Sequence, residues 1–527
     1  MIRHTRLLTT LAVACSTVLV LGACGSGDTA SGATATQNVV EAGDPVAGGT
    51  ARILQMGEPR SLDPAALSNT WAHQPTLGNA LYGTLMITNN ETLEPEYKMA
   101  TAFSSDDGGK TFTLAVRPGL VFSDGSPLDA AAVKYNWDRL KDPALGSTTI
   151  RQAVQIESTE VVDPSTMRVT MVKPNPQFAQ AIVAGALNWI ASPAALEQGS
   201  QAFDRNPVGA GPFKLVSWTR QDSVELEKNP QYWDAPKPYL DKLVIRTVAD
   251  ANQRSNTMTT GGADLTTETS WTNINKAEAA GLQYLVAPTG GGQFAGMNQR
   301  RAPFDDVRAR RAVSLAVDLD AVNTVVYNGE GEVPKTLFPE DSPYYADIPL
   351  NTTDAVEAQR LFDELAAEGK PVSFTFLSYP TTESRVLGEA IQAQLSAFEN
   401  VQMNVEVADF PAVTARAGAR DFDMLVSSSI TQDPDYALTI GFDSTSSGNF
   451  MGVNNPDLDA ALERGRFGQT TEERKAAYDE VQRIIADTVV GLWYVRALPS
   501  VTFGKNLHGA QIYTLGSPLP EELWISN

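Results

Sequence analysis

The sequence contains few of the residues and motifs that carry covalent chemistry. Its 527 residues include two cysteines and three histidines, which are too few for a disulfide framework or a histidine-rich metal site. The motifs GxSxG, HExxH, CxxC, GxGxxG and the Walker A loop are absent. Carboxylates are plentiful, but no pair stands out as the acid pair of a glycosidase. We therefore predict a binding protein with no catalytic residues, metal or cofactor, and keep a hydrolase as an alternative.

Positive charge is also scarce. The chain has 62 acidic side chains against 40 basic ones, for a net charge of −22. A surface of this sign repels phosphate backbones and anionic headgroups. The composition therefore argues against nucleic acid as a partner and against direct docking on anionic lipid.

Long apolar runs are missing as well. Residues 7–21 form an apolar segment of about 15 residues, shorter than the roughly 20 that span a bilayer as a helix. Arg3, His4 and Arg6 precede it, which is the layout of a signal peptide. Its ending, Leu-Gly-Ala-Cys, resembles the bacterial lipobox. We predict that residues 1–23 are removed and that Cys24 carries a lipid; a secreted protein with an incidental cysteine is the alternative.

The segment after Cys24 has little to bury. Residues 24–47 are rich in Gly, Ala, Ser and Thr, a composition that favours a flexible tether. We expect it to let a folded body move above the membrane, with the lipid on Cys24 as the one attachment.

The remaining chain shows strand and helix patterns. Residues 51–56 read as a strand, and Phe112, Leu114 and Val116 alternate as in a half-buried strand. A turn and a helix capped by Asp129 follow. In the second half, predicted helices over 353–368, 383–398 and 412–419 alternate with the strands VSFTFL, VQMNVEV and DMLVSSS. This alternation predicts βα units and a partly parallel sheet, whose carboxyl ends bind ligands.

Several segments together resemble the bacterial extracellular solute-binding proteins, family 5, of the oligopeptide, dipeptide and nickel type. They occur in family order from about Gly48 to Trp524. These segments are GGTARI with SLDP, LYGTL, DDGGKTFTLAVRPGLVFSDGSPLDAAAVKYNWDR, VGAGPFKLVSWTRQDSVELEKNPQYW, NQRRAPFDDVRARRAVSLAVD and TEERKAAYDEVQRIIADTVVGLWY.

The resemblance implies an α/β, two-lobed fold of the periplasmic-binding-protein type with a third, inserted domain. Residues 48–80, 208–290 and 496–527 would form domain I, residues 81–207 the inserted domain II, and residues 291–495 domain III, the opposing lobe. Crossings near 290–298 and 494–499 would connect the lobes. Gly290, Gly291 and Gly292 suit either a hinge or a plain loop.

The resemblance also implies a site. In peptide-binding members, the loop before Asp-Pro carries a tryptophan and an aspartate that accepts the peptide's ammonium group. Ser427 and Ile430 stand at those places here, so we expect a solute held by apolar and neutral contacts, such as an N-blocked peptide or another polar organic solute. Asp433-Pro434-Asp435 is either part of this site or only a turn. The predicted ligand-binding residues are Glu58, Arg60, Trp271, Phe294, Tyr379, Ser428, Ile430, Gln432, Asp433 and Tyr436.

The function implied is that of an extracytoplasmic, lipid-anchored, monomeric receptor. It would capture the solute between its lobes and deliver it to the permease and ATPase subunits of an ABC importer. A sensor or structural lipoprotein on the same fold is a further alternative. The ligand itself is not readable from the pattern, because pocket residues lie on loops.

Overall fold

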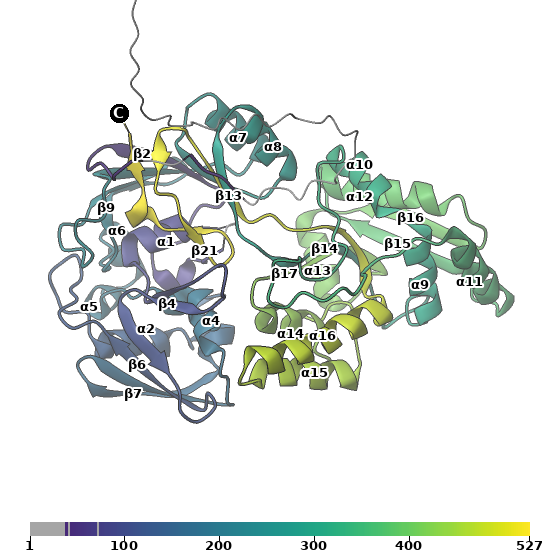
Figure 1. Ribbon diagram of the computed structural model, residues 1–527, viewed down its shortest axis with the longest axis horizontal. Coiled ribbons are helices and arrows are strands. Elements are labelled where there is room, and N and C mark those ends of the chain that lie inside the picture. The colour runs from purple at the N-terminus through teal and green to yellow at the C-terminus, as the bar shows by residue number, and fades with distance from the viewer. Residues whose placement is uncertain (1–36, 41–42, 71–72, 527) are drawn as a thin grey trace, which may run out of the picture. The chain divides into compact units, whose positions relative to one another are not determined.

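The computed structural model describes residues 37–40, 43–70 and 73–526 (Figure 1). The predicted signal peptide, Cys24 and most of the predicted tether lie outside these residues. In the part of the chain that is described, no helix is both long and apolar enough to cross a membrane.

An eight-stranded sheet joins distant parts of the chain. Its strand order is β1-β13-β19-β12-β2-β11-β10-β9. The predicted strand over residues 51–56 is β2, which lies parallel to β11 and β12 in the middle of the sheet. Helices α7 and α8 pack together beside β12 and β13 (Figure 1). The bounds are β1 (Gln37–Asn38), β2 (Thr50–Gln55), β9 (Phe213–Thr219), β10 (Ser223–Lys228), β11 (Lys242–Thr247), α7 (Ala251–Thr259), β12 (Leu265–Glu268), α8 (Trp271–Ala279), β13 (Gln283–Val286) and β19 (Ser500–Phe503).

A four-stranded antiparallel sheet, β5-β6-β8-β7, is built from one continuous part of the chain. It confirms the predicted local signals: β6 buries Phe112, Leu114 and Val116, and the side chain of Asp129 caps α2 by accepting a hydrogen bond from the backbone N of Ala132. The bounds in this region are α1 (Pro75–Tyr82), β3 (Met86–Thr88), β4 (Pro95–Tyr97), β5 (Ala100–Ser104), β6 (Thr111–Val116), α2 (Ala130–Arg139), α3 (Ile150–Ala153), β7 (Ile156–Asp163), β8 (Thr166–Met171), α4 (Phe178–Val183), α5 (Pro193–Leu196) and α6 (Ser200–Arg205).

A five-stranded sheet, β16-β15-β17-β14-β18, forms the second half. β15 is parallel to β16 and β17, whereas β14 is antiparallel to β17 and β18, so the predicted partly parallel sheet is confirmed. The bounds are β14 (Gly290–Met297), α9 (Val307–Ala316), α10 (Leu319–Tyr327), α11 (Ala355–Ala367), β15 (Val372–Ser378), α12 (Thr382–Leu395), β16 (Val401–Val407), α13 (Phe410–Ala419), β17 (Met424–Thr431), α14 (Pro434–Phe442), α15 (Pro456–Phe467), α16 (Thr471–Thr488) and β18 (Gly491–Val495).

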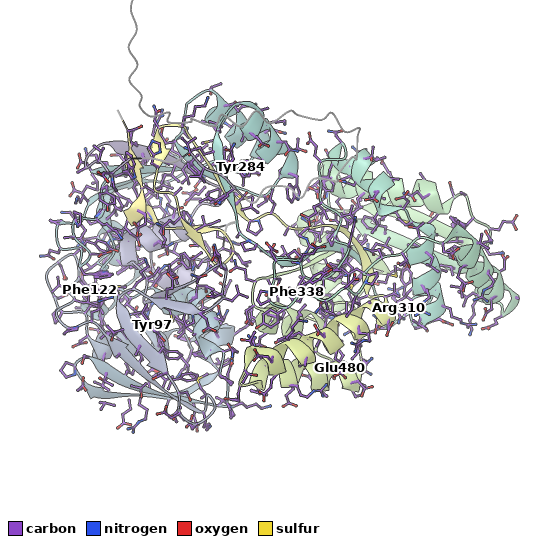
Figure 2. The ribbon with its side chains drawn as sticks, viewed as in Figure 1. Tyr97, Phe122, Tyr284, Arg310, Phe338 and Glu480 are labelled. Carbon is purple, nitrogen blue, oxygen red and sulfur yellow. The ribbon has the colours of Figure 1, made fainter. Side chains whose placement is uncertain are left out.

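The hydrophobic cores define two lobes. One core, which includes Phe122, packs the first two sheets together, and we call this part the first lobe. Two further cores cover opposite faces of the five-stranded sheet, which with its helices is the second lobe, and one of these cores also includes Trp271 and Ile274 of α8 in the first lobe. Phe338 belongs to the other core, on the side of α14, α15 and α16 (Figure 2). The strands nearest the C-terminus are short and lie in the first lobe: β20 (Leu507–His508), β21 (Ile512–Tyr513), β22 (Ser517–Pro518) and β23 (Trp524–Ile525).

Two chain crossings connect the lobes. Residues 287–289 lead from β13 to β14, and residues 496–499 lead from β18 to β19. The glycine run lies just past the first crossing, inside β14, and not in a free loop. Gly291 has φ +72°, and a Cβ there would lie 1.8 Å from the carbonyl oxygen of Ser429. Glycine is needed here because the backbones of β14 and β17 approach closely.

Candidate ligand-binding cleft

A pocket of about 740 Å³ is lined by residues of both lobes, and we call it the cleft. The first lobe contributes the first turns of α7 and α8 and the loop before α8. The second lobe contributes parts of α10, α12, β14 and β17, and the second crossing completes the wall. Tyr379 follows β15, and Ile430 lies near the end of β17. The cleft therefore lies at the carboxyl ends of parallel strands, where ligands bind in such sheets.

The first-lobe wall is held by a buried carboxylate. Glu268, 1% exposed, accepts hydrogen bonds from the backbone N of Thr269 at 2.7 Å and of Ser270 at 3.1 Å. The Ser270 side chain then caps α8, whose first residue is Trp271. The indole Nε1 of Trp271 donates to the carbonyl of Arg496 at 3.3 Å. These contacts fix an aromatic ring at the cleft.

Arg254 lies beneath this wall, fully buried. Its guanidinium lies 3.7 Å from a carboxylate oxygen of Glu268 and donates to the carbonyls of Val248 and Ala249, each at 2.9 Å. Burial lowers the pKa of Arg254, while Glu268 and Asp250 act in the opposite direction. The pair therefore ties the loop before α8 to the start of α7.

The second-lobe wall carries the hydroxyl of Tyr327 and the carboxylate of Glu383, and the buried Tyr494 contacts Gln293 of the same wall. The hydroxyl of Tyr327 on α10 donates to Oε1 of Glu383 on α12. The hydroxyl of Tyr494 donates to Oε1 of Gln293 at 2.6 Å. Burial raises the pKa of Tyr327, and electrostatic interactions with Tyr494 and Glu383 act in the same direction. Burial and then Glu383 raise the pKa of Tyr494 as well. Both hydroxyls therefore stay protonated near neutral pH.

Arg496 joins the two crossings. It is 6% exposed, and its Nε lies 2.7 Å from a carboxylate oxygen of Glu332. Its Nη1 donates to the carbonyls of Gly291 and Leu337, at 3.3 and 3.2 Å. Since Arg496 itself lies on the second crossing and Gly291 lies next to the first, one guanidinium links both connections between the lobes.

Four of the predicted ligand-binding residues line the cleft: Trp271, Tyr379, Ser428 and Ile430. The cleft is also lined by three residues that the sequence did not lead us to predict: Tyr327, Glu383 and Arg496. Glu383 could have been found, because it follows Tyr379 in the loop and helix after the same strand, at the sheet edge where ligands gather.

Phe294 does not line the cleft. It is 2% exposed, and its ring lies 4.4 Å from that of Trp493 and 6.2 Å from that of Phe442, in the core. Successive residues of a strand face opposite sides of the sheet. Gln293 therefore faces the cleft, and Phe294 faces the helices behind it.

Four more of the predicted residues lie elsewhere in the structure. Glu58 accepts a hydrogen bond from the backbone N of Gln221 at 2.9 Å, and Arg60 donates to the carbonyl of Gly146 at 3.1 Å, so both make contacts within the first lobe. Gln432 donates to Oδ1 of Asn90 at 3.1 Å. Tyr436 lies beside first-lobe residues Arg151 and Gln152, and its burial raises its pKa. The last two contacts join the lobes outside the cleft.

Asp433 has a structural role. It caps α14 by accepting from the backbone N of Asp435 at 3.0 Å. Its two carboxylate oxygens accept from Arg474 at 2.7 and 2.8 Å, and the two side chains are 9% and 5% exposed. Asp433-Pro434-Asp435 is thus the start of a helix, outside the cleft. Among the described residues, no group of three or more His, Cys, Asp or Glu could hold a metal ion.

Comparisons with known proteins agree with this architecture. The glutathione-binding protein GsiB of Shigella boydii is 29% identical over 322 residues, which cover 59% of this chain and 62% of that protein, less than two thirds of its length. GsiB of Pectobacterium atrosepticum is 29% identical over 410 residues, covering 74% and 78%. The substrate-binding protein CtaP of Listeria monocytogenes has the same fold, with a TM-score of 0.77 at 22% identity over 91% of this chain and all of that one.

The family model decides the assignment. The model of bacterial extracellular solute-binding proteins, family 5 middle region, matches residues 94–449. This span is more than half of the chain, and it runs from the inserted antiparallel sheet through the cleft-forming strands to the loop after α14. The chain belongs to family 5 of the bacterial extracellular solute-binding proteins.

Proposed function

We propose that this protein captures a peptide-like or other polar organic solute in the cleft and delivers it to an ABC importer. The observation that carries the proposal is a pocket of about 740 Å³ whose walls come from both lobes. A volume of this size suits a small organic molecule. The walls combine apolar side chains with hydroxyl, amide and backbone groups, which supports a solute that is partly polar.

The mechanism is a shift between open and closed arrangements of the lobes. A solute that contacts Trp271 on one side and Ser428 on the other gains both sets of contacts only when the lobes approach each other. It therefore stabilises the closed form by its differential affinity. Arg496 keeps the two crossings together during this movement. The closed form would then be the one that the permease and ATPase assembly recognises.

The relatives suggest which solute to test first. The Shigella and Pectobacterium proteins are named for glutathione binding, and glutathione is a small peptide-like molecule of the proposed class. Neither a hydrolase nor a structural lipoprotein is favoured by any of the contacts in the cleft.

Native mass spectrometry of freshly purified protein, followed by calorimetry with the co-purified solute and with glutathione, tests the proposal. We expect one solute per monomer. Ser428→Trp should abolish binding because the indole fills the cleft. Ser217→Trp places the same side chain at an exposed position of β9 and should bind as the parent does. Equal binding by the two variants would place the solute outside the cleft.

We propose further that the protein is a monomer outside the cytoplasm, held at the membrane by a lipid on Cys24. The proposal rests on the lipobox-like sequence and the polar segment after it. Cys24→Ala should release the protein from the membrane fraction, because the chain would then have lost its acyl chains. The measurement is fractionation of cells followed by immunoblotting. Full retention of the variant in the membrane fraction would contradict the proposed anchor.

A further inference from the structure

The charges that line the cleft do not balance. Arg496 and Glu383 are the two charged residues among those that line it. The positive charge of Arg496 is already paired with Glu332 and surrounded by backbone carbonyls. Among the described residues, no ion pair includes Glu383. A negative charge therefore faces the cleft without a cation to offset it.

The position of Glu383 suits contact with a solute. It lies in the first turn of α12, directly after the strand β15, and is exposed at the cleft. Its Oε1 accepts a hydrogen bond from Tyr327, which orients the carboxylate, and this is the one hydrogen bond of its side chain within the described residues. A carboxylate has room for several further donors on its two oxygens.

The surroundings of Glu383 suit a cationic nitrogen. The rings of Trp271, Tyr327 and Tyr379 line the same cleft, and so does the apolar side chain of Ile430. Aromatic faces attract ammonium groups, and a carboxylate forms its strongest hydrogen bonds with charged donors. Closure of the lobes would exclude water and strengthen this attraction.

Building on the function proposed above, we propose that Glu383 binds a positively charged nitrogen of the solute, either a primary ammonium group or a quaternary one. The cleft would then select a cationic or zwitterionic organic solute. This differs from the solute held by apolar and neutral contacts that we expected from Ile430 alone. An acid in the first turn of a helix also stabilises that helix, so the test must separate binding from stability.

The experiment uses four probes on the full-length protein: a tryptic digest of casein, the same digest after N-acetylation of all amines, choline, and glycine betaine. Retained molecules are measured by native mass spectrometry, and affinities by calorimetry. The variant is Glu383→Gln, which keeps an acceptor for Tyr327 and removes the charge. Glu389→Gln on the same helix is the matched control, since Glu389 does not line the cleft. Thermal unfolding of both variants measures any effect on α12.

We expect the parent and Glu389→Gln to retain amine-bearing peptides or one of the quaternary amines, and Glu383→Gln to lose roughly tenfold or more in affinity. Retention of peptides alone identifies the primary ammonium, and retention of choline or betaine alone identifies the quaternary one. Equal affinity of parent and Glu383→Gln, or equal retention of the acetylated digest by the parent, overturns the inference while leaving solute capture intact. If the parent retains none of the four probes, the inference fails, and the co-purified solute then decides on the proposed function separately.

Discussion

Asp433 and Glu383 are carboxylates of the second lobe in opposite situations. Asp433 is buried against Arg474 and caps a helix. Glu383 is exposed at the cleft and has a tyrosine hydroxyl as its partner. A buried carboxylate whose oxygens are already paired has little left to offer a solute, whereas an exposed one can accept a new donor. At the residue scale, the partners of a side chain decide between a structural and a binding role.

The buried pair leads to a stability prediction. Asp433→Asn keeps a good helix cap but leaves the guanidinium of Arg474 buried without its counter-charge, so we expect a loss of about 3 kcal/mol in the free energy of unfolding. Glu480 and Arg464 form a surface ion pair whose side chains are 39% and 53% exposed. Glu480→Gln breaks this pair and should lower the free energy of unfolding by less than about 1 kcal/mol. Urea unfolding followed by circular dichroism measures both. A stable Asp433→Asn protein with weakened solute binding would instead restore Asp433 to the binding site.

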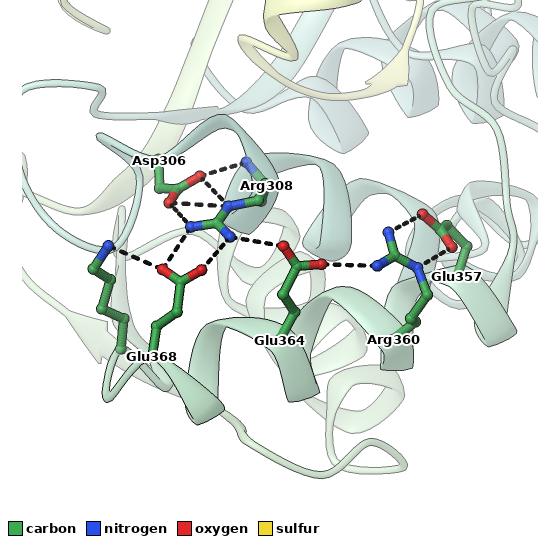
Figure 3. A network of polar contacts seen from close by, with 7 residues as sticks. Asp306, Arg308, Glu357, Arg360, Glu364 and Glu368 are labelled. Atoms are coloured by element: carbon green, nitrogen blue, oxygen red, sulfur yellow. Dashed lines mark hydrogen bonds and ion pairs between the residues drawn. The ribbon is translucent and has the colours of Figure 1, made fainter.

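At the scale of elements, an ion-pair network joins α9 to α11 (Figure 3). Arg308 contacts Asp306 at 2.7 Å, Glu364 at 2.8 Å and Glu368 at 2.7 Å. Arg360 extends the network to Glu357 on the surface of α11. One arginine with three carboxylate partners holds the start of α9 against the helix packed beside it.

The network makes the second lobe sensitive to acid. Hydrogen bonds from Arg308 lower the pKa of Glu368 to about 2, from an ordinary value of 4.5, and they also lower the pKa of Asp306 and Glu364. A carboxylate whose pKa is lower in the folded state stabilises that state above its unfolded pKa. This contribution is lost as the pH falls from about 4.5 towards 2.

Arg308→Ala should therefore lower the melting temperature at pH 7, and the difference from the parent should shrink as the pH falls below about 4.5. Calorimetric scans between pH 7 and pH 3 measure this. Because the groups are partly exposed to solvent, 1 M salt should also reduce the difference. Arg168→Ala is the control, since Arg168 has one exposed partner, Glu160. A difference that does not change with pH would mean that Arg308 acts through packing alone.

At the scale of the whole molecule, the two crossings and the contacts across the lobes determine how the protein moves. Arg496 joins the crossings on one side of the cleft, and Gln432 contacts Asn90 across the lobes at another place. The contact of Arg496 lies next to both crossings, so a rotation of one lobe against the other changes it little. The contact of Gln432 with Asn90 is made between residues of opposite lobes and must break when they separate.

Solute binding should therefore reduce the radius of gyration of the protein in solution. Small-angle scattering with and without saturating solute measures the change, and Ser428→Trp, in which the cleft is filled, should show no response. An unchanged radius in the parent at saturation would exclude closure of the lobes as the consequence of binding.

The sequence by itself determined the local elements and the family. The alternation of Phe112, Leu114 and Val116, the cap at Asp129 and the succession of strands and helices from β15 to β17 follow from interactions within a few residues. Such patterns are readable because each element buries one face whatever its partner is. The ordered motifs then placed the chain in its family.

Only the tertiary structure decided which side chains meet at the cleft. Trp271, Tyr327 and Glu383 are far apart in the chain, and they come together because α8 and α12 begin at the cleft and α10 ends there. Phe294 and Gln293 are neighbours in sequence with opposite roles, because a shift of one residue along a strand changes the face of the sheet. Asp433 pairs with Arg474, 41 residues away. Contacts of this kind depend on register and packing between distant segments, which local patterns do not encode.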